Sequence, residues 1–176
     1  AERLIGWNTL EVLALGAGTP QRPINAIPAE AVAHCQLRFV VGTPWRQVAE
    51  LVREHLAAHG FGQIEVTVTL EGAATRLDVD DPWVDWASGS IARSVGQTPT
   101  VLPNLAGSLP NDVFADLLGL PTVWVPHSYP ACQQHAPDEH LLRPVAREAL
   151  QIMAGLFWDL GIFTPAARQP ASSAAA

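Results

Sequence analysis

The order of apolar and polar residues in the first third of the chain predicts strand, strand, helix and strand. Residues 8–15 and 31–41 are mostly apolar, and the glycines and prolines between them mark turns that separate two strands. After Thr43, which is placed to cap a helix, apolar residues recur at helical spacing until Gly60. Strict alternation over residues 64–69 then predicts a half-buried strand.

The pattern in the rest of the chain predicts alternating helices and strands. Asp81 and the proline after it are typical of a helix start, and Gly96 is typical of a helix end. An apolar run bounded by glycine and proline suits a buried parallel strand. The predicted helix, strand, helix, strand and helix cover residues 82–95, 98–102, 110–118, 120–125 and 142–157. This alternation indicates the α/β class.

A polar, acidic stretch at residues 71–81 marks the predicted boundary between two regions. We therefore expect one domain at residues 1–72, a second at 73–165 and a disordered tail at 166–176. A length of 176 residues corresponds to about one domain at ~150 residues each. Both predicted domains are consequently small or incomplete.

The amino-acid composition and net charge argue against several classes of function. All ten basic residues are arginines, which excludes a P-loop lysine and a Schiff-base lysine in this chain. The net charge of -7 argues against nucleic acid as a partner, and no apolar run has the ~18 residues of a membrane span. Two cysteines far apart in sequence form no disulfide scaffold, so a cytoplasmic location is expected.

The densest group of chemically active side chains lies in residues 126–140, just after the last predicted strand. It contains three histidines and two adjacent carboxylates, which are His127, His135, His140, Asp138 and Glu139. Ligands of open α/β sheets bind at the carboxyl ends of strands, and histidine is the commonest metal ligand. No closed zinc motif is present, so solvated or capping histidines remain the alternative.

Two further pairs of residues are candidates for ligand binding. Gly107 and Ser108 precede a predicted helix start, where free backbone N–H groups can face an anion, although an ordinary helix cap fits equally. Asn25 and Arg38 are thirteen residues apart, a spacing that places them on adjacent strands. The guanidinium of Arg38 suits a substrate carboxylate, and a surface salt bridge is the alternative.

His55 and His59 lie four residues apart on the first predicted helix, a spacing that can hold a metal. No glutamate follows His55 as the metalloprotease motif requires. Because His59 precedes Gly60, an ordinary role at the helix C-terminus is the alternative.

Together these segments resemble the group of zinc amidohydrolases that includes acetylornithine deacetylase, succinyl-diaminopimelate desuccinylase and carboxypeptidase G. Residues 25–28 (Asn-Ala-Ile-Pro) with Arg38 are similar to the lid domain of that family. Gly107-Ser108, residues 118–122 (Leu-Gly-Leu-Pro-Thr) and residues 135–139 (His-Ala-Pro-Asp-Glu) are similar to its catalytic part. The motifs occur in the family's order and span residues 8–162.

The resemblance implies a partial ferredoxin-like dimerisation domain followed by the C-terminal part of a zinc-peptidase-like α/β catalytic domain. The implied reaction is hydrolysis of the amide bond in an N-acyl amino acid or small peptide that bears a carboxylate. His135 would be a zinc ligand, Asn25 would hold the oxyanion and Arg38 would bind the substrate carboxylate. Gly107 and Ser108 would line the substrate pocket, and the complete protein would hold two zinc ions.

The same resemblance places the other metal ligands and the general base before Ala1. We therefore expect this chain by itself to be inactive, since a catalytic zinc needs about three protein ligands. The alternative is a non-catalytic dimerisation or binding module that lacks the metal-binding half. A homodimer is expected in either case, through the first predicted strands and the helix after Thr43.

Overall fold

The computed structural model describes residues 2–105 and 107–165, and it divides the chain into two units. Unit 1 comprises residues 1–76 and 104–117, and unit 2 comprises residues 77–103 and 118–176. The mixed α/β character expected from the sequence is present, whereas the domains at 1–72 and 73–165 stay a prediction. The expected tail at 166–176 lies outside the described residues.

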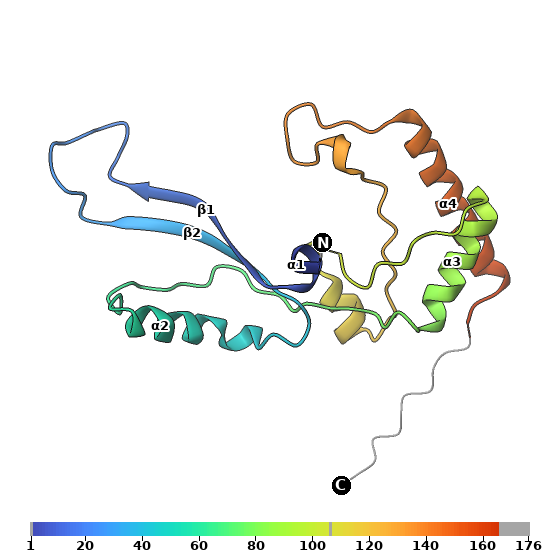
Figure 1. The fold of residues 1–176 in the computed structure, drawn as a ribbon, viewed down its shortest axis with the longest axis horizontal. Helices are drawn as coiled ribbons and strands as arrows, with labels where there is room; N and C mark the ends of the chain where they lie inside the picture. Colours follow the sequence, from blue (N-terminus) through green and yellow to red (C-terminus); the bar gives the residue numbers. More distant parts are fainter. Residues whose placement is uncertain (1, 106, 166–176) are drawn as a thin grey trace, which may run out of the picture. The chain divides into compact units, whose positions relative to one another are not determined.

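Unit 1 is built on an antiparallel pair of strands, β1 (Thr9–Ala17) and β2 (Ala31–Arg38), after a short helix α1 (Glu2–Gly6) (Figure 1). The pairing runs from Thr9↔Arg38 to Ala17↔Ala31, with an irregularity at Leu13 that a β-bulge explains. Both predicted strands are confirmed.

Apolar side chains on β1 remain in contact with solvent on both faces of this sheet. Leu10, Val12, Leu13 and Leu15 are 63–75% exposed, and none of the described side chains of unit 1 is buried. A two-stranded sheet needs further strands or a packed helix for independent stability. The sheet therefore requires a covering surface that the described residues of unit 1 do not supply.

The helix predicted after Thr43 forms, but it begins later. A 3-10 turn η1 (Trp45–Gln47) leads into α2 (Val48–Ala58). Thr43 does not cap α2, because the N-cap position of α2 is Gln47; the Thr43 hydroxyl donates at 3.3 Å to the side-chain oxygen of Asn8, which also accepts from the Val40 N–H. The end is as predicted: Gly60 has a φ of 82°, and Phe61 N–H bonds to Leu56 O at 2.8 Å. This is a Schellman motif.

Three predicted strands are absent from the remaining segments, and one predicted helix is shortened. Residues 64–69, 98–102 and 120–125 form no strand, and the described residues contain no strand besides β1 and β2. Backbone groups of a strand need a neighbouring strand, and without one the apolar pattern leaves an irregular segment. The helix predicted at 110–118 is reduced to two helical residues and the π-helical turn η2 (Val113–Leu117).

Unit 2 contains the packed core of the chain, between α3 (Pro82–Val95) and α4 (Arg143–Ile162), which lie side by side (Figure 1). Both predicted helices are confirmed. The Asp81 carboxylate caps α3 by accepting from Trp83 N–H at 2.9 Å, and Gly96 ends it with a φ of 75°. The buried apolar side chains at the helix contact are Ala87, Ile91 and Ile152. No described helix is long and apolar enough to cross a bilayer.

Candidate functional site

The loop that carries His135 is anchored by its own backbone and by one buried side chain. A 3-10 turn η3 (Pro130–Cys132) begins it, and the free thiol of Cys132 is buried. The Cys132 carbonyl accepts from His140 N–H at 3.1 Å, which closes the loop. The Tyr129 hydroxyl accepts from Leu142 N–H at 3.1 Å, so the loop is tied to the start of α4.

Three non-glycine residues in this loop adopt left-handed backbone conformations. Gln133, His135 and Asp138 have φ values of 55°, 65° and 64°. Such conformations cost about 1–3 kcal/mol each and concentrate at functional sites. The Glu139 carboxylate accepts from the His135 backbone N–H at 3.2 Å, which holds the histidine in this conformation. The sequence predicts Glu139 as one of two adjacent carboxylates and as the last residue of the 135–139 motif, and not as the partner of the His135 backbone N–H.

His135 and His140 are both exposed, and the ring of His140 is held by two contacts within the loop. His140 Nδ1 bonds to the Asp138 carbonyl at 2.9 Å, and its ring packs edge-on against Tyr129 at 6.2 Å between centroids. His127 is half-buried. The Asp138 carbonyl thus orients the His140 ring, and His135 and His140 are both exposed to solvent.

A complete metal centre is not formed by the part of the chain that the structure describes. Among residues 2–105 and 107–165, no three side chains of His, Cys, Asp or Glu are grouped to hold a metal ion. A zinc site needs three or four protein ligands. His135 alone does not meet that requirement, so no catalytic step through a metal is derived from this chain.

The other predicted site residues all belong to unit 1. Arg38 ends β2 and is half-buried, and no hydrogen bond or ion pair engages its guanidinium within the described ranges. Asn25 is exposed in the loop between β1 and β2, so the prediction that it lies on a strand beside Arg38 is wrong. Gly107 and Ser108 are exposed in the segment before η2.

Asn25 and Arg38 lie toward opposite ends of the hairpin. β2 runs from Ala31, next to the loop, to Arg38, and seven steps of ~3.3 Å give a span of ~23 Å. The loop that carries Asn25 projects beyond the Ala31 end (Figure 1). One small substrate therefore cannot contact both side chains of a single chain.

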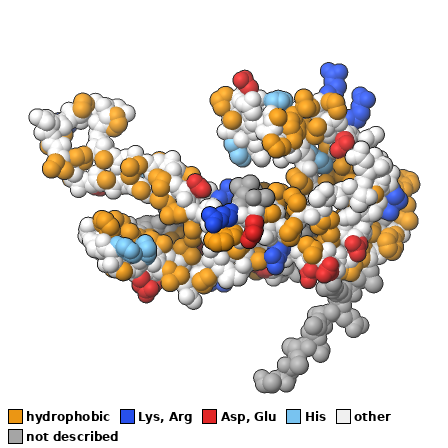
Figure 2. Space-filling view, viewed as in Figure 1, with side chains coloured by type: hydrophobic (Ala, Val, Ile, Leu, Met, Phe, Trp, Pro, Cys, Tyr) orange, Lys and Arg blue, Asp and Glu red, His pale blue; other side chains and the backbone are white. Residues whose placement is uncertain are grey.

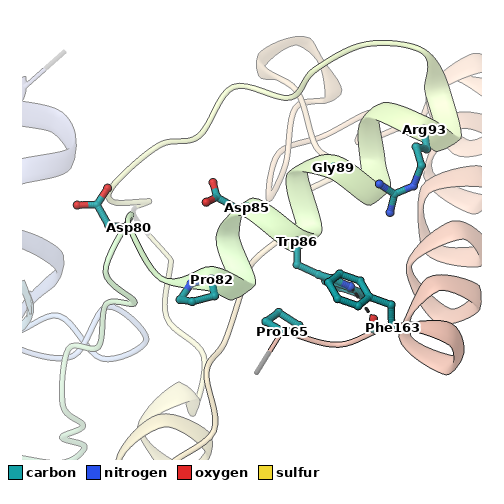
Figure 3. Close-up of a pocket in the computed structure, with 8 residues that line it drawn as sticks. All are labelled: Asp80, Pro82, Asp85, Trp86, Gly89, Arg93, Phe163 and Pro165. Atoms are coloured by element: carbon teal, nitrogen blue, oxygen red, sulfur yellow. Dashed lines mark hydrogen bonds between the residues drawn. The ribbon is translucent and has the colours of Figure 1, made fainter. Parts of the chain in front are cut away.

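A cavity of about 540 Å³ lies in unit 2, between α3 and the segment that follows α4 (Figure 3). Its polar side chains are largely occupied: Arg93 pairs with Asp159 at 2.6 Å, and Trp86 Nε1 donates to the Phe163 carbonyl at 2.8 Å. The Arg93 guanidinium lowers the pKa of Asp159. None of the predicted site residues lines the cavity, which is formed by Asp80, Pro82, Asp85, Trp86, Gly89, Arg93, Phe163 and Pro165.

Comparison with known proteins identifies the fold. No protein-family model and no curated protein matches the sequence. Among solved structures, the chain is similar to part of a metallo-carboxypeptidase of the M20 family from Sulfolobus solfataricus, with a TM-score of 0.71 and 23% identity. The match covers 92% of this chain and 38% of that protein, so the chain spans well under half of its structural relative. The fold is that of part of an M20 metallopeptidase, which confirms the resemblance drawn from the motifs.

Proposed function

We propose that this chain is the C-terminal portion of a zinc-dependent hydrolase that cleaves an amide bond in an N-acyl amino acid or small peptide. The observation that carries the proposal is the structural match, which extends over 92% of the chain. The motifs at Asn25, Arg38, Gly107 and His135 occur within this matched fold in the order expected for the family.

The proposed roles follow from how each side chain is held. His135 is a zinc ligand, supported by its exposed position and by the left-handed backbone that Glu139 holds. Arg38 binds the substrate carboxylate, supported by its half-buried position at the end of β2 and by a guanidinium that is unengaged among the described residues. Asn25 stabilises the oxyanion, and Gly107 with Ser108 lines the substrate pocket.

The proposed homodimer follows from the separation of Asn25 and Arg38 along the hairpin. Because ~23 Å of strand lies between Ala31 and Arg38, one active site would take Asn25 and Arg38 from different copies of the chain. The exposed apolar side chains of β1 support a partner surface at the same sheet.

A non-catalytic dimerisation or binding module is the second candidate function. It is favoured by one observation, the lack of any three-residue metal-binding group in residues 2–105 and 107–165. The two candidates differ in whether sequence encoded directly upstream supplies the remaining metal ligands.

The deciding experiment expresses the chain fused to its native upstream coding region, with zinc present. The protein is assayed on N-acyl amino acids and dipeptides, and bound zinc is measured by elemental analysis. We expect hydrolysis that His135→Ala abolishes together with part of the bound zinc, while His34→Ala, a strand histidine outside the site, retains both. Hydrolysis that survives His135→Ala, or no hydrolysis of any substrate, refutes the proposal.

The role of Arg38 is tested in the same protein. Arg38→Ala removes a charge-assisted interaction worth about 1.5–3 kcal/mol, so kcat/KM is expected to fall ~10–150-fold. Arg22→Ala is the matched control, because Arg22 is an exposed arginine of the same unit. Equal kcat/KM values for the two variants would show that Arg38 does not bind the substrate.

A further inference from the structure

Two histidines stand together on the surface at the C-terminal end of α2. The rings of His55 and His59 have centroids 4.2 Å apart and are tilted by 37°. Both side chains are exposed, and Figure 2 shows histidines gathered over the end of this helix. Residues four apart on a helix share one face, and two metal–nitrogen bonds of ~2.1 Å can join imidazoles at this separation.

A hydrogen bond determines which ring nitrogen of His59 is available. Nδ1 of His59 lies 2.8 Å from the His55 carbonyl oxygen. Because a carbonyl only accepts, Nδ1 carries the proton and Nε2 of the neutral ring keeps its lone pair. Metal-binding histidines are usually held in this way, with the second nitrogen donating to a carbonyl or carboxylate. The tautomer of His59 is thus already the one that a metal ion needs.

The surrounding charges favour a cation at this position. α2 ends at Ala58, and the negative end of the helix dipole lies in its last turn. The nearest arginine along the helix, Arg53, donates to the Val66 carbonyl at 2.9 Å and pairs with Glu50 at 3.2 Å. Residues two apart on a helix do not face each other, so the Arg53 guanidinium is not directed at the histidines.

We propose that His55 and His59 form a two-histidine chelate for a divalent transition-metal ion. Imidazole ligands suit Cu²⁺, Ni²⁺ and Zn²⁺, and the order of affinities at such a site places Cu²⁺ first. Since the described residues offer no third protein ligand here, water fills the remaining coordination positions. The chelate lies in unit 1, does not involve His135 and is independent of the proposed hydrolase function.

The test is isothermal titration of the full chain, without a histidine tag, using Cu²⁺, Ni²⁺ and Zn²⁺ separately. We expect a site that binds Cu²⁺ most tightly and that weakens at least ~10–100-fold in His55→Ala and in His59→Ala, since losing a ligand costs no less than losing its hydrogen-bond partner. His34→Ala, which removes a histidine from β2 of the same unit, is expected to bind as the wild type does.

A second measurement keeps the test independent of variant folding. Paramagnetic Ni²⁺ added to the unmodified chain should broaden the imidazole NMR signals of His55 and His59 first. Broadening that begins at other histidines, or titrations in which neither alanine variant loses affinity, would overturn the proposal.

Discussion

Replacing Gly155 with alanine tests the close approach of α3 and α4. A Cβ added at residue 155 would collide with the Ser94 Oγ and would lie 3.0 Å from the Ser94 Cβ. The Ser94 hydroxyl is held by a 2.9 Å hydrogen bond to the carbonyl of Ser90, whose side chain is fully buried. The side chain of Ser94 therefore cannot yield without loss of a hydrogen bond or a shift of the helices.

Two opposing effects determine how far Gly155→Ala changes the free energy of unfolding. Overpacking of this kind costs about 1–3 kcal/mol, whereas alanine is favoured over glycine inside a helix by up to ~1 kcal/mol. We expect Gly155→Ala to lower the free energy of unfolding by ~0–2 kcal/mol. Gly161→Ala in the same helix is the matched control, because no atom lies within 4 Å of a Cβ added there. That control is expected to be neutral or stabilising by up to ~1 kcal/mol.

The measurement is urea unfolding of both variants, followed by far-ultraviolet circular dichroism. The two free energies of unfolding should differ by about 1–3 kcal/mol, which is the packing cost alone. If Gly155→Ala were as stable as Gly161→Ala, the close helix contact derived from the structure would be wrong.

Three further predictions concern single interactions in unit 2. Asp81→Ala should lower the free energy of unfolding by ~0.5–2 kcal/mol in urea unfolding, while Asp81→Asn, which still caps α3, should retain most of it. The pairing with Arg93 lowers the folded-state pKa of Asp159. The contribution of Asp159 to the free energy of unfolding is therefore complete above the unfolded-state pKa and is lost as the pH falls through the folded-state pKa. The loss of stability on acidification should consequently be less steep in Asp159→Asn than in the wild type. Glu139→Ala should speed amide hydrogen exchange at His135, measured by NMR, whereas Glu139→Gln keeps an acceptor and should exchange more slowly than Glu139→Ala. Equal profiles or rates within any of these pairs would contradict the corresponding interaction.

The parts of the fold that the sequence predicted correctly are those whose determinants are local. α3 has its cap at Asp81 and its left-handed end at Gly96, both within one turn of the helix. The strands β1 and β2 are adjacent in the chain, and the turn residues between them let each supply the other's hydrogen bonds. The residues that set the boundaries of these elements lie within the elements or next to them, so the sequence shows them directly.

The wrong predictions concern elements that depend on a hydrogen-bonding partner elsewhere in the chain. The apolar run at 120–125 and the alternation at 64–69 have strand-like patterns, yet no neighbouring strand pairs with them in the described structure. Thr43 has the chemistry of a helix cap, but its hydroxyl bonds instead to Asn8, 35 residues away in the chain. The order of apolar and polar residues does not reveal which hydrogen-bond partner a side chain takes, since that choice depends on which groups the fold brings together.

For the candidate site, the sequence by itself predicts His135, Arg38 and Asn25 from the family motifs around them. Tertiary structure alone decided that Glu139 holds the His135 backbone and that Asn25 and Arg38 lie toward opposite ends of one hairpin. Residue types report which chemistry is possible, because donors, acceptors and charges belong to the side chain. Distance and backbone conformation decide which of those groups can act together, and residue types report neither.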